Sequence, residues 1–336
     1  MRKGLFILLL ILAAGCSKIP HSKDNIVPLD AYIFFDAEVK KTKGNLIEGV
    51  QLPVDEGTAF GVLGLKGENT AVFDTYIAGE NGNSRFSNVA KMYRPSDEGE
   101  FTYDELALWT TEQHSFYAYY PYDAECIDNV ALGEEGKPYI CYTQPTKLEE
   151  MKDILTASVT NMSYSTNTLV ELAFDHRLFA FDVVINNTLE DEVVVTGASI
   201  TFTDLAKTAD LNFDGSITTS TETLTFTTEF GEHTVPAASS TEGETKPYEY
   251  SLNNGNSFLF LPCSSLKVDF ELKFLNALGK EITFKNTESL TLTPKSEKFE
   301  AGKKYALVLT RKKSGNIVTF TPSVEWESIN ITHTFN

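Results

Sequence analysis

The sequence has 336 residues, of which 47 are acidic and 28 basic, so the formal net charge is −19. Such acidity argues against nucleic acid and against an anionic membrane surface as the partner, because both carry negative charge themselves. Removal of an export segment would leave about 320 residues, more than one hydrophobic core usually serves, so two domains are expected.

The first sixteen residues predict export and lipidation. Two basic residues precede an apolar run from Leu5 to Leu12, and Ala13-Ala14-Gly15-Cys16 follows. The run is far shorter than the roughly 20 apolar residues of a spanning helix, so residues 1–15 are predicted to be a signal peptide. Small residues directly before a cysteine form the pattern that lipoprotein-processing enzymes recognise, which makes Cys16 the predicted lipidation site. An ordinary signal peptide cut after a small residue is the alternative.

A lipidated Cys16 would hold the protein on a membrane. Stable anchoring needs more than one acyl chain, and a diacylated, N-acylated cysteine carries several. Ser17 is not an acidic retention signal, which favours the outer membrane. Residues 16–29 would form the lipidated linker.

Period-two alternation recurs along the mature chain and predicts an all-β protein of two tandem β-sandwich domains. We expect an N-terminal domain over residues 30–178 and a C-terminal domain over residues 179–336. A short helix is expected only within Lys147–Ala157, and a long exposed loop over Glu232–Lys246. The predicted strands are rich in β-branched and aromatic residues and cover Ile33–Val39, Leu178–Ile185, Val193–Phe202, Ser257–Leu261, Leu266–Phe274, Tyr305–Thr310 and Ile317–Val324.

Three cysteines remain after Cys16, an odd number for an oxidising compartment. Cys126 and Cys141 are close enough in sequence to form a disulfide, and closing that loop would stabilise the fold by about 3 kcal/mol. The alternative is that Cys126, Cys141 and Cys263 are separate buried thiols that pack as small hydrophobic side chains.

Motifs that would indicate catalysis or a cofactor are not found. The histidines are scattered without the i, i+4 spacing of a zinc helix, and no nucleophile elbow, phosphate loop or dinucleotide fingerprint occurs. Asp210-Leu211-Asn212-Phe213-Asp214-Gly215 spaces oxygen ligands as calcium loops do, but position twelve is Thr221 in place of a bidentate glutamate. A hairpin with an Asp-Gly turn is the preferred interpretation, and no metal or cofactor is predicted.

Two further segments have a functional and a structural interpretation. Asp175-His176-Arg177 could supply a catalytic base, but it begins an apolar strand, which favours a histidine that is hydrogen-bonded within the packed end of that strand. The run Phe116-Tyr117-Ala118-Tyr119-Tyr120-Pro121-Tyr122 could stack sugar rings. A strand with packed aromatic side chains on both faces, ended by Pro121, is preferred.

The two ends of the mature chain carry comparable apolar stripes. Near the start, Ile33, Phe35, Ala37 and Val39 alternate with polar residues, and the basic segment Lys40-Lys41-Thr42-Lys43-Gly44 follows. Cleavage in this segment, at Lys41, Lys43 or Gly44, could release the first strand and open a groove.

At the other end, apolar residues change parity near Glu327-Ser328, so residues 327–336 are expected to form a separate strand. Ile329, Ile331 and Phe335 lie on its apolar side. In a neighbouring subunit, this strand could fill the groove by β-strand addition, and such head-to-tail contacts build filaments. The alternative is that both strands pair within their own domains.

The chain resembles the fimbrillin-like lipoproteins of Bacteroidales, which build donor-strand pili. The motifs that carry this resemblance span most of the chain: the lipobox at Cys16, the strand Ile33–Val39 with its basic end, the aromatic run 116–122, Lys152-Asp153-Ile154-Leu155-Thr156-Ala157-Ser158, Leu172-Ala173-Phe174-Asp175-His176-Arg177-Leu178, Ala301-Gly302-Lys303-Lys304-Tyr305-Ala306-Leu307, and Trp326.

This resemblance implies two β-sandwich domains of transthyretin-like topology, export as a lipoprotein and trimming of the first strand. It also implies a pilus subunit whose partners are other fimbrillin-like subunits, with the outer membrane reached through the lipid and a host protein or glycan as candidate adhesive ligand. The chain departs from the best-known members, which are cut after arginine, because only lysines precede Gly44 and the first arginine after Arg2 is Arg85. A non-polymerising pilus anchor and an outer-membrane glycan-binding lipoprotein are therefore the alternatives.

Overall fold

The computed structural model describes residues 27–39, 58–73, 76–78, 84–95, 100–165, 169–241, 244–253, 256–276, 278–294, 296–314, 317–325 and 329–331. Over these residues the protein is all-β, as the alternation predicts, and its helical elements are two 3-10 turns, Glu134–Gly136 and Leu148–Glu150. The predicted helix over Lys147–Ala157 is therefore limited to one turn. Ile154 and Leu155 are fully buried, and their packing favours an extended strand over the local helical preference.

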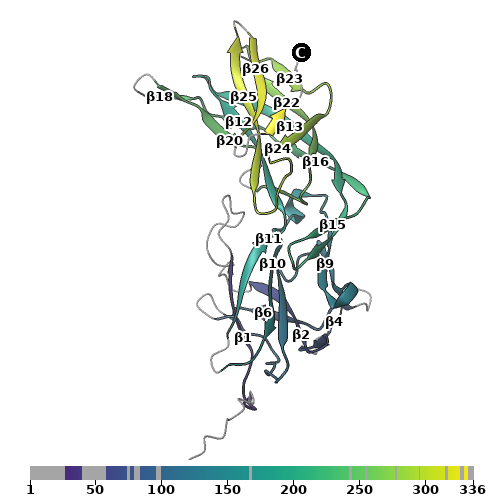
Figure 1. The fold of residues 1–336 in the computed structure, drawn as a ribbon. Helices are drawn as coiled ribbons and strands as arrows, with labels where there is room; N and C mark the ends of the chain where they lie inside the picture. The colour runs from purple at the N-terminus through teal and green to yellow at the C-terminus, as the bar shows by residue number, and fades with distance from the viewer. Residues whose placement is uncertain are drawn as a thin grey trace, which may run out of the picture.

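The N-terminal half is built on one large sheet (Figure 1). Its order is β1-β11-β10-β7-β2-β3, and β6 also pairs with β2. The strands are β1 (Phe34–Val39), β11 (Leu169–His176), β10 (Leu155–Met162), β7 (His114–Tyr120), β2 (Ala59–Lys66), β3 (Thr70–Ala71) and β6 (Val89–Tyr93), with a separate hairpin of β4 (Tyr76–Ala78) and β5 (Ser84–Ser87).

The C-terminal half contains two large sheets. In the first, β12 (Phe179–Asn187) lies between β20 (Tyr248–Ser251) and a parallel neighbour, β25 (Lys304–Ser314), which continues to β26 (Ile317–Glu325). β21 (Phe258–Phe260) also pairs with β12. The second has the order β16-β13-β22-β24-β27, with β17 on β13 and β23 on β22. Its strands are β13 (Val193–Ala206), β16 (Thr223–Phe230), β17 (His233–Val235), β22 (Leu266–Leu275), β23 (Glu281–Lys285), β24 (Leu290–Pro294) and β27 (Ile329–Ile331).

A small sheet joins the two halves. Its order is β15-β14-β9-β8, from β8 (Ile127–Leu132) and β9 (Pro138–Thr143) before residue 178 and β14 (Thr208–Asn212) and β15 (Ile217–Thr219) after it. Leu211 of β14 pairs with Ile140 of β9, and both side chains are fully buried. The expected boundary at residue 178 remains a prediction, since this sheet draws strands from both sides of it.

The core forms two clusters. One lies entirely in the N-terminal half and includes Phe60, Phe116 and Phe174. The other runs from Tyr119 and Ile140 into the C-terminal half, where Phe202 packs against Phe258 and Phe260 with ring centroids 5.1 and 4.9 Å apart. Strand β7 lies between the clusters and contributes alternate residues to each.

The region expected to be a long loop, Glu232–Lys246, contains short strands. β17 pairs with the start of β13, and β18 (Ser239–Thr241) pairs with β19 (Glu244–Lys246) to form a small hairpin. Figure 1 shows this hairpin on an arm that projects from the C-terminal half. Thr and Ser can occupy an exposed hairpin as readily as a loop, so composition did not reveal these strands.

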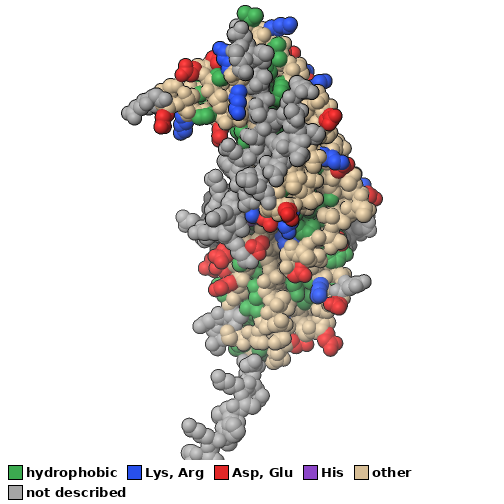
Figure 2. Space-filling model, turned by 45° about the horizontal axis from the view of Figure 1, so that its top comes forward, with side chains coloured by type: hydrophobic (Ala, Val, Ile, Leu, Met, Phe, Trp, Pro, Cys, Tyr) green, Lys and Arg blue, Asp and Glu red, His purple; other side chains and the backbone are tan. Residues whose placement is uncertain are grey.

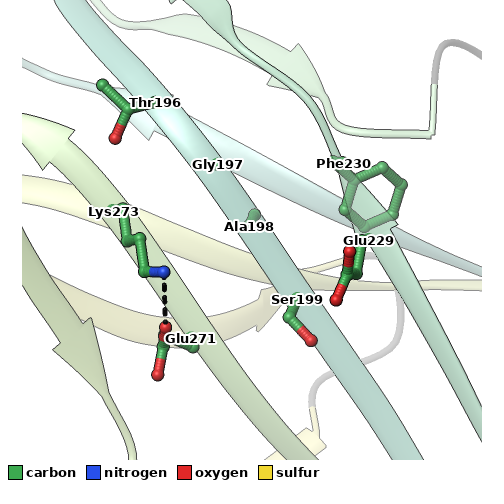
Figure 3. A pocket seen from close by; sticks show the side chains of 8 residues that line it. All are labelled: Thr196, Gly197, Ala198, Ser199, Glu229, Phe230, Glu271 and Lys273. Carbon is green, nitrogen blue, oxygen red and sulfur yellow. Dashed lines mark ion pairs between the residues drawn. The ribbon is translucent and has the colours of Figure 1, made fainter.

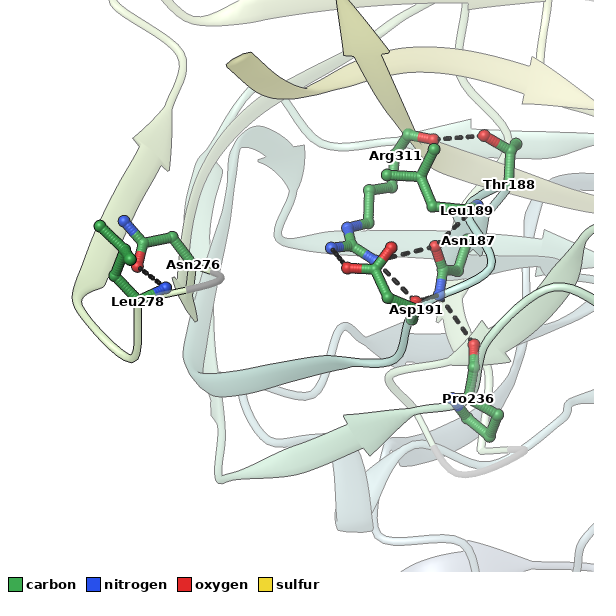
Figure 4. A network of polar contacts seen from close by, with 8 residues as sticks. All are labelled: Asn187, Thr188, Leu189, Asp191, Pro236, Asn276, Leu278 and Arg311. Carbon is green, nitrogen blue, oxygen red and sulfur yellow. Dashed lines mark hydrogen bonds and ion pairs between the residues drawn. The ribbon is translucent and has the colours of Figure 1, made fainter. Parts of the chain in front are cut away.

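A buried arginine, Arg311, holds together the ends of two strands in the C-terminal half (Figure 4). Arg311 on β25 donates through Nη1 to Asn187 Oδ1 at 3.2 Å and to the Asp191 carbonyl at 2.8 Å, and its Nη2 pairs with the Asp191 carboxylate at 2.9 Å. The Asn187 amide also donates to the Asp191 and Pro236 carbonyls. These contacts tie the ends of β12 and β25 to the turn between β12 and β13.

Candidate subunit-assembly site

Strand β1 lies at the edge of the N-terminal sheet. It pairs with β11 alone among the described strands, in parallel, from Phe34 opposite Leu169 to Val39 opposite Phe174. Just before it, the Ile33 amide donates to the Ala107 carbonyl at 2.9 Å. Parallel pairing is slightly weaker per residue than antiparallel pairing, so β1 is held on one side by the weaker type of ladder.

The inward side chains of β1 complete the N-terminal core. Ile33, Phe35 and Ala37 are 0%, 6% and 4% exposed, as the alternation predicts, whereas only the backbone of Val39 is described. The Phe35 ring centroid lies 5.2, 6.0 and 6.4 Å from those of Phe116, Tyr103 and Phe73. Removal of β1 would therefore open an apolar groove lined by aromatic rings.

Tyr103 links β1 to the rest of the domain. Its hydroxyl donates to the Ile33 carbonyl at 2.8 Å and accepts the Ala107 amide at 3.1 Å. Burial raises the pKa of Tyr103, so it stays a neutral donor. Sequence reasoning missed this residue, since seventy positions separate it from Ile33 and no local pattern signals the contact.

The outward face of β1 is less favourable for pairing. Asp36 lies directly opposite Glu171 of β11, and both side chains are exposed. Like charges in direct opposition on neighbouring strands destabilise a sheet. The strand that closes the groove therefore faces electrostatic repulsion from its one described neighbour.

The predicted cleavage and lipidation sites lie outside the described residues, namely Lys41, Lys43, Gly44 and Cys16. The predicted donor segment is described only in part. Ile329 and Ile331 lie in β27, which pairs antiparallel with β24 of the same chain, and Phe335 is outside the described residues. Pairing within its own sheet counts against a tail that projects freely, so the donor role remains a prediction.

The described cysteines, Cys126, Cys141 and Cys263, form no disulfide, so the candidate bond between Cys126 and Cys141 is not present. Cys126 is buried beside Tyr142 in the core. Cys141 precedes Tyr142 on β9 and points to the opposite face of the sheet. Burial, followed by the nearby carboxylates of Asp210 and Asp128, raises the pKa of the Cys141 thiol. The two sulfur atoms are thus on different faces of the small sheet.

The candidate calcium loop is the β14–β15 turn, and the guanidinium group of Arg177 binds its backbone. Arg177 is buried and its Nη2 donates to the Asn212 and Ser216 carbonyls at 3.1 and 2.8 Å. Gly215 adopts a left-handed φ of +98° in the turn, and Asp214 accepts hydrogen bonds from the Ser216 amide and hydroxyl. Among the described residues no group of three or more acidic, histidine or cysteine side chains could hold a metal ion. These contacts favour the hairpin interpretation.

His176 is a buried, hydrogen-bonded side chain. Its Nδ1 lies 2.7 Å from Asp153 Oδ2, and the histidine side chain is fully inaccessible to solvent. Burial raises the pKa of Asp153, and the contact with His176 partly opposes that shift. The Asp153 side chain is only 12% exposed, so this pair lacks the access to solvent that a catalytic base needs.

The aromatic run lies on β7 with both faces packed. Phe116 belongs to the N-terminal cluster and Tyr119 to the other cluster, while Tyr117 packs on Phe213 at 5.5 Å. Gly61 lies directly against the Tyr119 ring, so any side chain at this position would collide with it. These rings therefore support the core and do not present a sugar-binding surface.

The outer face of the C-terminal sheet has a shallow hollow of about 350 Å³ (Figure 3). It forms where a bulge in β13 brings Gly197 opposite Lys273, and Ser199 lies between Glu229 and Glu271 on the neighbouring strands. Lys273 and Glu271 form an ion pair at 3.3 Å. The hollow is open and polar, and its lining includes one aromatic residue, Phe230, which also packs on Phe258.

The described part of the molecule contains no helix long and apolar enough to cross a membrane. Acidic side chains are distributed along the whole visible length of the molecule (Figure 2), in keeping with the net charge.

Comparison with known proteins points to one family. The model of the fimbrillin-like family matches residues 49–326. A fimbrial protein from Bacteroides vulgatus has the same fold, with a TM-score of 0.55 and 17% identity over 88% of this chain and 99% of its own. The fimbrial anchor protein Mfa2 from Porphyromonas gingivalis aligns over 91% of this chain and 99% of its own, at 12% identity and a TM-score of 0.37. No curated protein sequence matches the chain.

Proposed function

The chain belongs to the fimbrillin-like family, and from this premise we propose that it is a structural subunit of a cell-surface fimbria that contributes to adhesion. The subunit is exported, lipidated at Cys16 and held on the outer membrane. Cleavage after Lys41 or Lys43 then removes the lipid together with β1. Its partners are other fimbrillin-like subunits, which join by β-strand addition.

The position of β1 is the observation that carries this proposal. It is an edge strand in a parallel ladder, its outward Asp36 faces Glu171, and its Phe35 packs among aromatic rings of the N-terminal core. An incoming strand that offers apolar residues at alternate positions and lacks the acidic residue opposite Glu171 would regain the buried contacts without that repulsion. The exchange of β1 for such a strand is therefore favourable.

The proposed donor is the tail, residues 327–336, with Ile329, Ile331 and Phe335 on its apolar side. Donation requires β27 to leave β24, where its described pairing extends over three residues. These three described pairs contribute few ladder hydrogen bonds, each of which adds about 1 kcal/mol to stability.

A non-polymerising anchor is the second candidate, and two observations favour it. The segment after β1 offers lysines and no arginine to a processing enzyme, and β27 is paired within its own chain. In this case β1 stays in place and Cys16 keeps its lipid. The glycan-binding alternative loses its original basis, since the aromatic run is packed in the core.

The test is to determine the N-terminus of the protein isolated from cell surfaces by mass spectrometry, beside an unboiled electrophoresis gel. The subunit proposal expects a start at or near Gly44 and a heat-sensitive ladder, and deletion of residues 327–336 should abolish the ladder while leaving the trimmed monomer. A lipidated start at Cys16 with monomer alone would establish the anchor in its place. A ladder that survives the deletion would refute the tail as donor.

A further inference from the structure

Exposed hydrophobic side chains gather at one end of the molecule. Nine large hydrophobic side chains are exposed among the described residues, and six of them form this group. We call them the apolar pole: Leu29, Tyr32, Phe34, Leu106, Leu108 and Leu169, which are 96%, 42%, 51%, 42%, 42% and 44% exposed. A cluster of this kind on a soluble domain marks an interaction surface.

Strand pairing brings four residues of the pole side by side. Tyr32 is bridged to Leu108 across an antiparallel contact, and Phe34 lies opposite Leu169 in the β1–β11 register. Tyr32 and Phe34 are two residues apart and so point to the same side of the chain. Leu29 precedes Tyr32 in a turn closed by the Ala31 amide and the Pro28 carbonyl at 3.2 Å.

The pole lies where the described chain begins. In Figure 1 the start of the described chain, in purple, is at the opposite end of the molecule from β22, β23 and β26. Cys16 is thirteen residues before Leu29, the first residue of the pole, and that length of chain spans at most about 47 Å when fully extended. An acyl group on Cys16 therefore keeps the start of the pole within this distance of the bilayer that holds it.

The exposed side chains along β1 change from apolar to acidic with distance from the start of the described chain. The rows nearest the chain start are apolar, Tyr32 with Leu108 and then Phe34 with Leu169, and the next row is acidic, Asp36 with Glu171. Tyr, Phe and Leu side chains partition into the interface of a bilayer, whereas carboxylates stay in water. The exposed carboxylates of Asp30, Asp104 and Glu105 beside the apolar rows disfavour an anionic lipid surface.

We propose that the apolar pole rests on the surface of a zwitterionic lipid bilayer before the subunit is trimmed. This inference rests on the lipid anchor of the proposed function and adds a second membrane contact to it. Leu29, Tyr32 and Phe34 all precede Lys41, so one cleavage removes the lipid and half of the pole together. The trimmed subunit loses the lipid and weakens the second contact in a single step, which releases it from the membrane.

The test uses the mature chain with Cys16→Ser, which carries no lipid, and phosphatidylcholine vesicles in a sedimentation assay. The pole variant Tyr32→Ser, Phe34→Ser, Leu108→Ser is compared with a matched control, Leu132→Ser, Tyr248→Ser, Leu278→Ser, whose side chains are similarly or more exposed but lie elsewhere. We expect the partition coefficient to fall by at least about tenfold in the pole variant and to stay unchanged in the control. Admixture of phosphatidylglycerol should weaken binding of the unsubstituted chain.

Two outcomes overturn the inference. One is that the unsubstituted chain does not bind phosphatidylcholine vesicles, or that both variants bind equally. The other is a concentration-dependent dimer, seen by sedimentation velocity, that the pole substitutions abolish, because it would assign the pole to a second copy. The fimbrial proposal is tested separately by the ladder on unboiled gels, which the pole substitutions should leave intact once the subunit is trimmed.

Discussion

The clearest test of the displaceable strand is Phe35→Ala. This substitution removes a ring that is 6% exposed and packs against three aromatic neighbours, so it should leave a cavity in the groove beneath β1. Truncation of a buried phenylalanine costs roughly 3–5 kcal/mol. If β1 can open by itself, that cost lowers the free energy of its opening and raises the opening population by about 100- to 4,000-fold.

Hydrogen exchange of the β1 peptide, read by mass spectrometry, measures this opening, and urea denaturation measures global unfolding alongside it. In the wild-type protein we expect β1 to exchange with a lower opening free energy than β7 or β10, because edge elements open sub-globally. Phe34→Ala is the matched control, since Phe34 belongs to the same strand but is 51% exposed, and its effect should stay within about 0.5 kcal/mol.

Two results would refute the reasoning. If the β1 peptide exchanges only at the rate of global unfolding, β1 is an integral part of the domain and cannot be exchanged without unfolding it. If Phe35→Ala and Phe34→Ala accelerate exchange equally, the contacts of Phe35 with Phe116 and Tyr103 do not hold β1 in place.

Three further predictions concern the rest of the chain. Arg177→Met should lower the free energy of unfolding by roughly 3–5 kcal/mol in urea denaturation, because two hydrogen bonds from a charged group to the β14–β15 turn are lost. The control is Lys207→Met, which removes an exposed ion pair with Glu222 and should cost less than about 1 kcal/mol. Equal costs for the two variants would contradict the role of Arg177. Burial lowers the pKa of His114, so as the pH falls this histidine is protonated in the unfolded chain before it is protonated in the folded chain, and stability falls below about pH 6.5. His114→Gln should therefore lose less unfolding free energy than the wild type between pH 7.5 and pH 5.5. An unchanged loss would show that other groups cause the pH dependence. In the Cys16→Ser chain, Cys126, Cys141 and Cys263 should all react with a thiol reagent after unfolding but only slowly at pH 8 in the folded state. The reason is that burial raises the pKa of Cys263 to about 12 and raises the pKa of Cys141 as well. An intact mass two hydrogens lower than that of the reduced chain would instead indicate a disulfide.

The strands themselves could be read from the sequence, because alternation in burial is a local property of the chain. Val193–Phe202 and Leu266–Phe274 were predicted as strands, and the structure has Val193–Ala206 and Leu266–Leu275. The inward set of the first strand, Ile33, Phe35 and Ala37, was identified in the same way. The family was also recognisable from motifs spread over the chain, and the match over residues 49–326 confirms it.

Only the tertiary structure decided which strands are neighbours. Alternation tells which side of a strand is buried but not which strand lies beside it. Hence the pairing of β1 with β11, the repulsion between Asp36 and Glu171, and the contact of Tyr103 with Ile33 could not be predicted. The same holds for Arg177, whose partners on the β14–β15 turn are more than thirty residues away. Sequence by itself determined the elements and the family, whereas long-range pairing determined where a strand can be exchanged and which exposed side chains meet at the apolar pole.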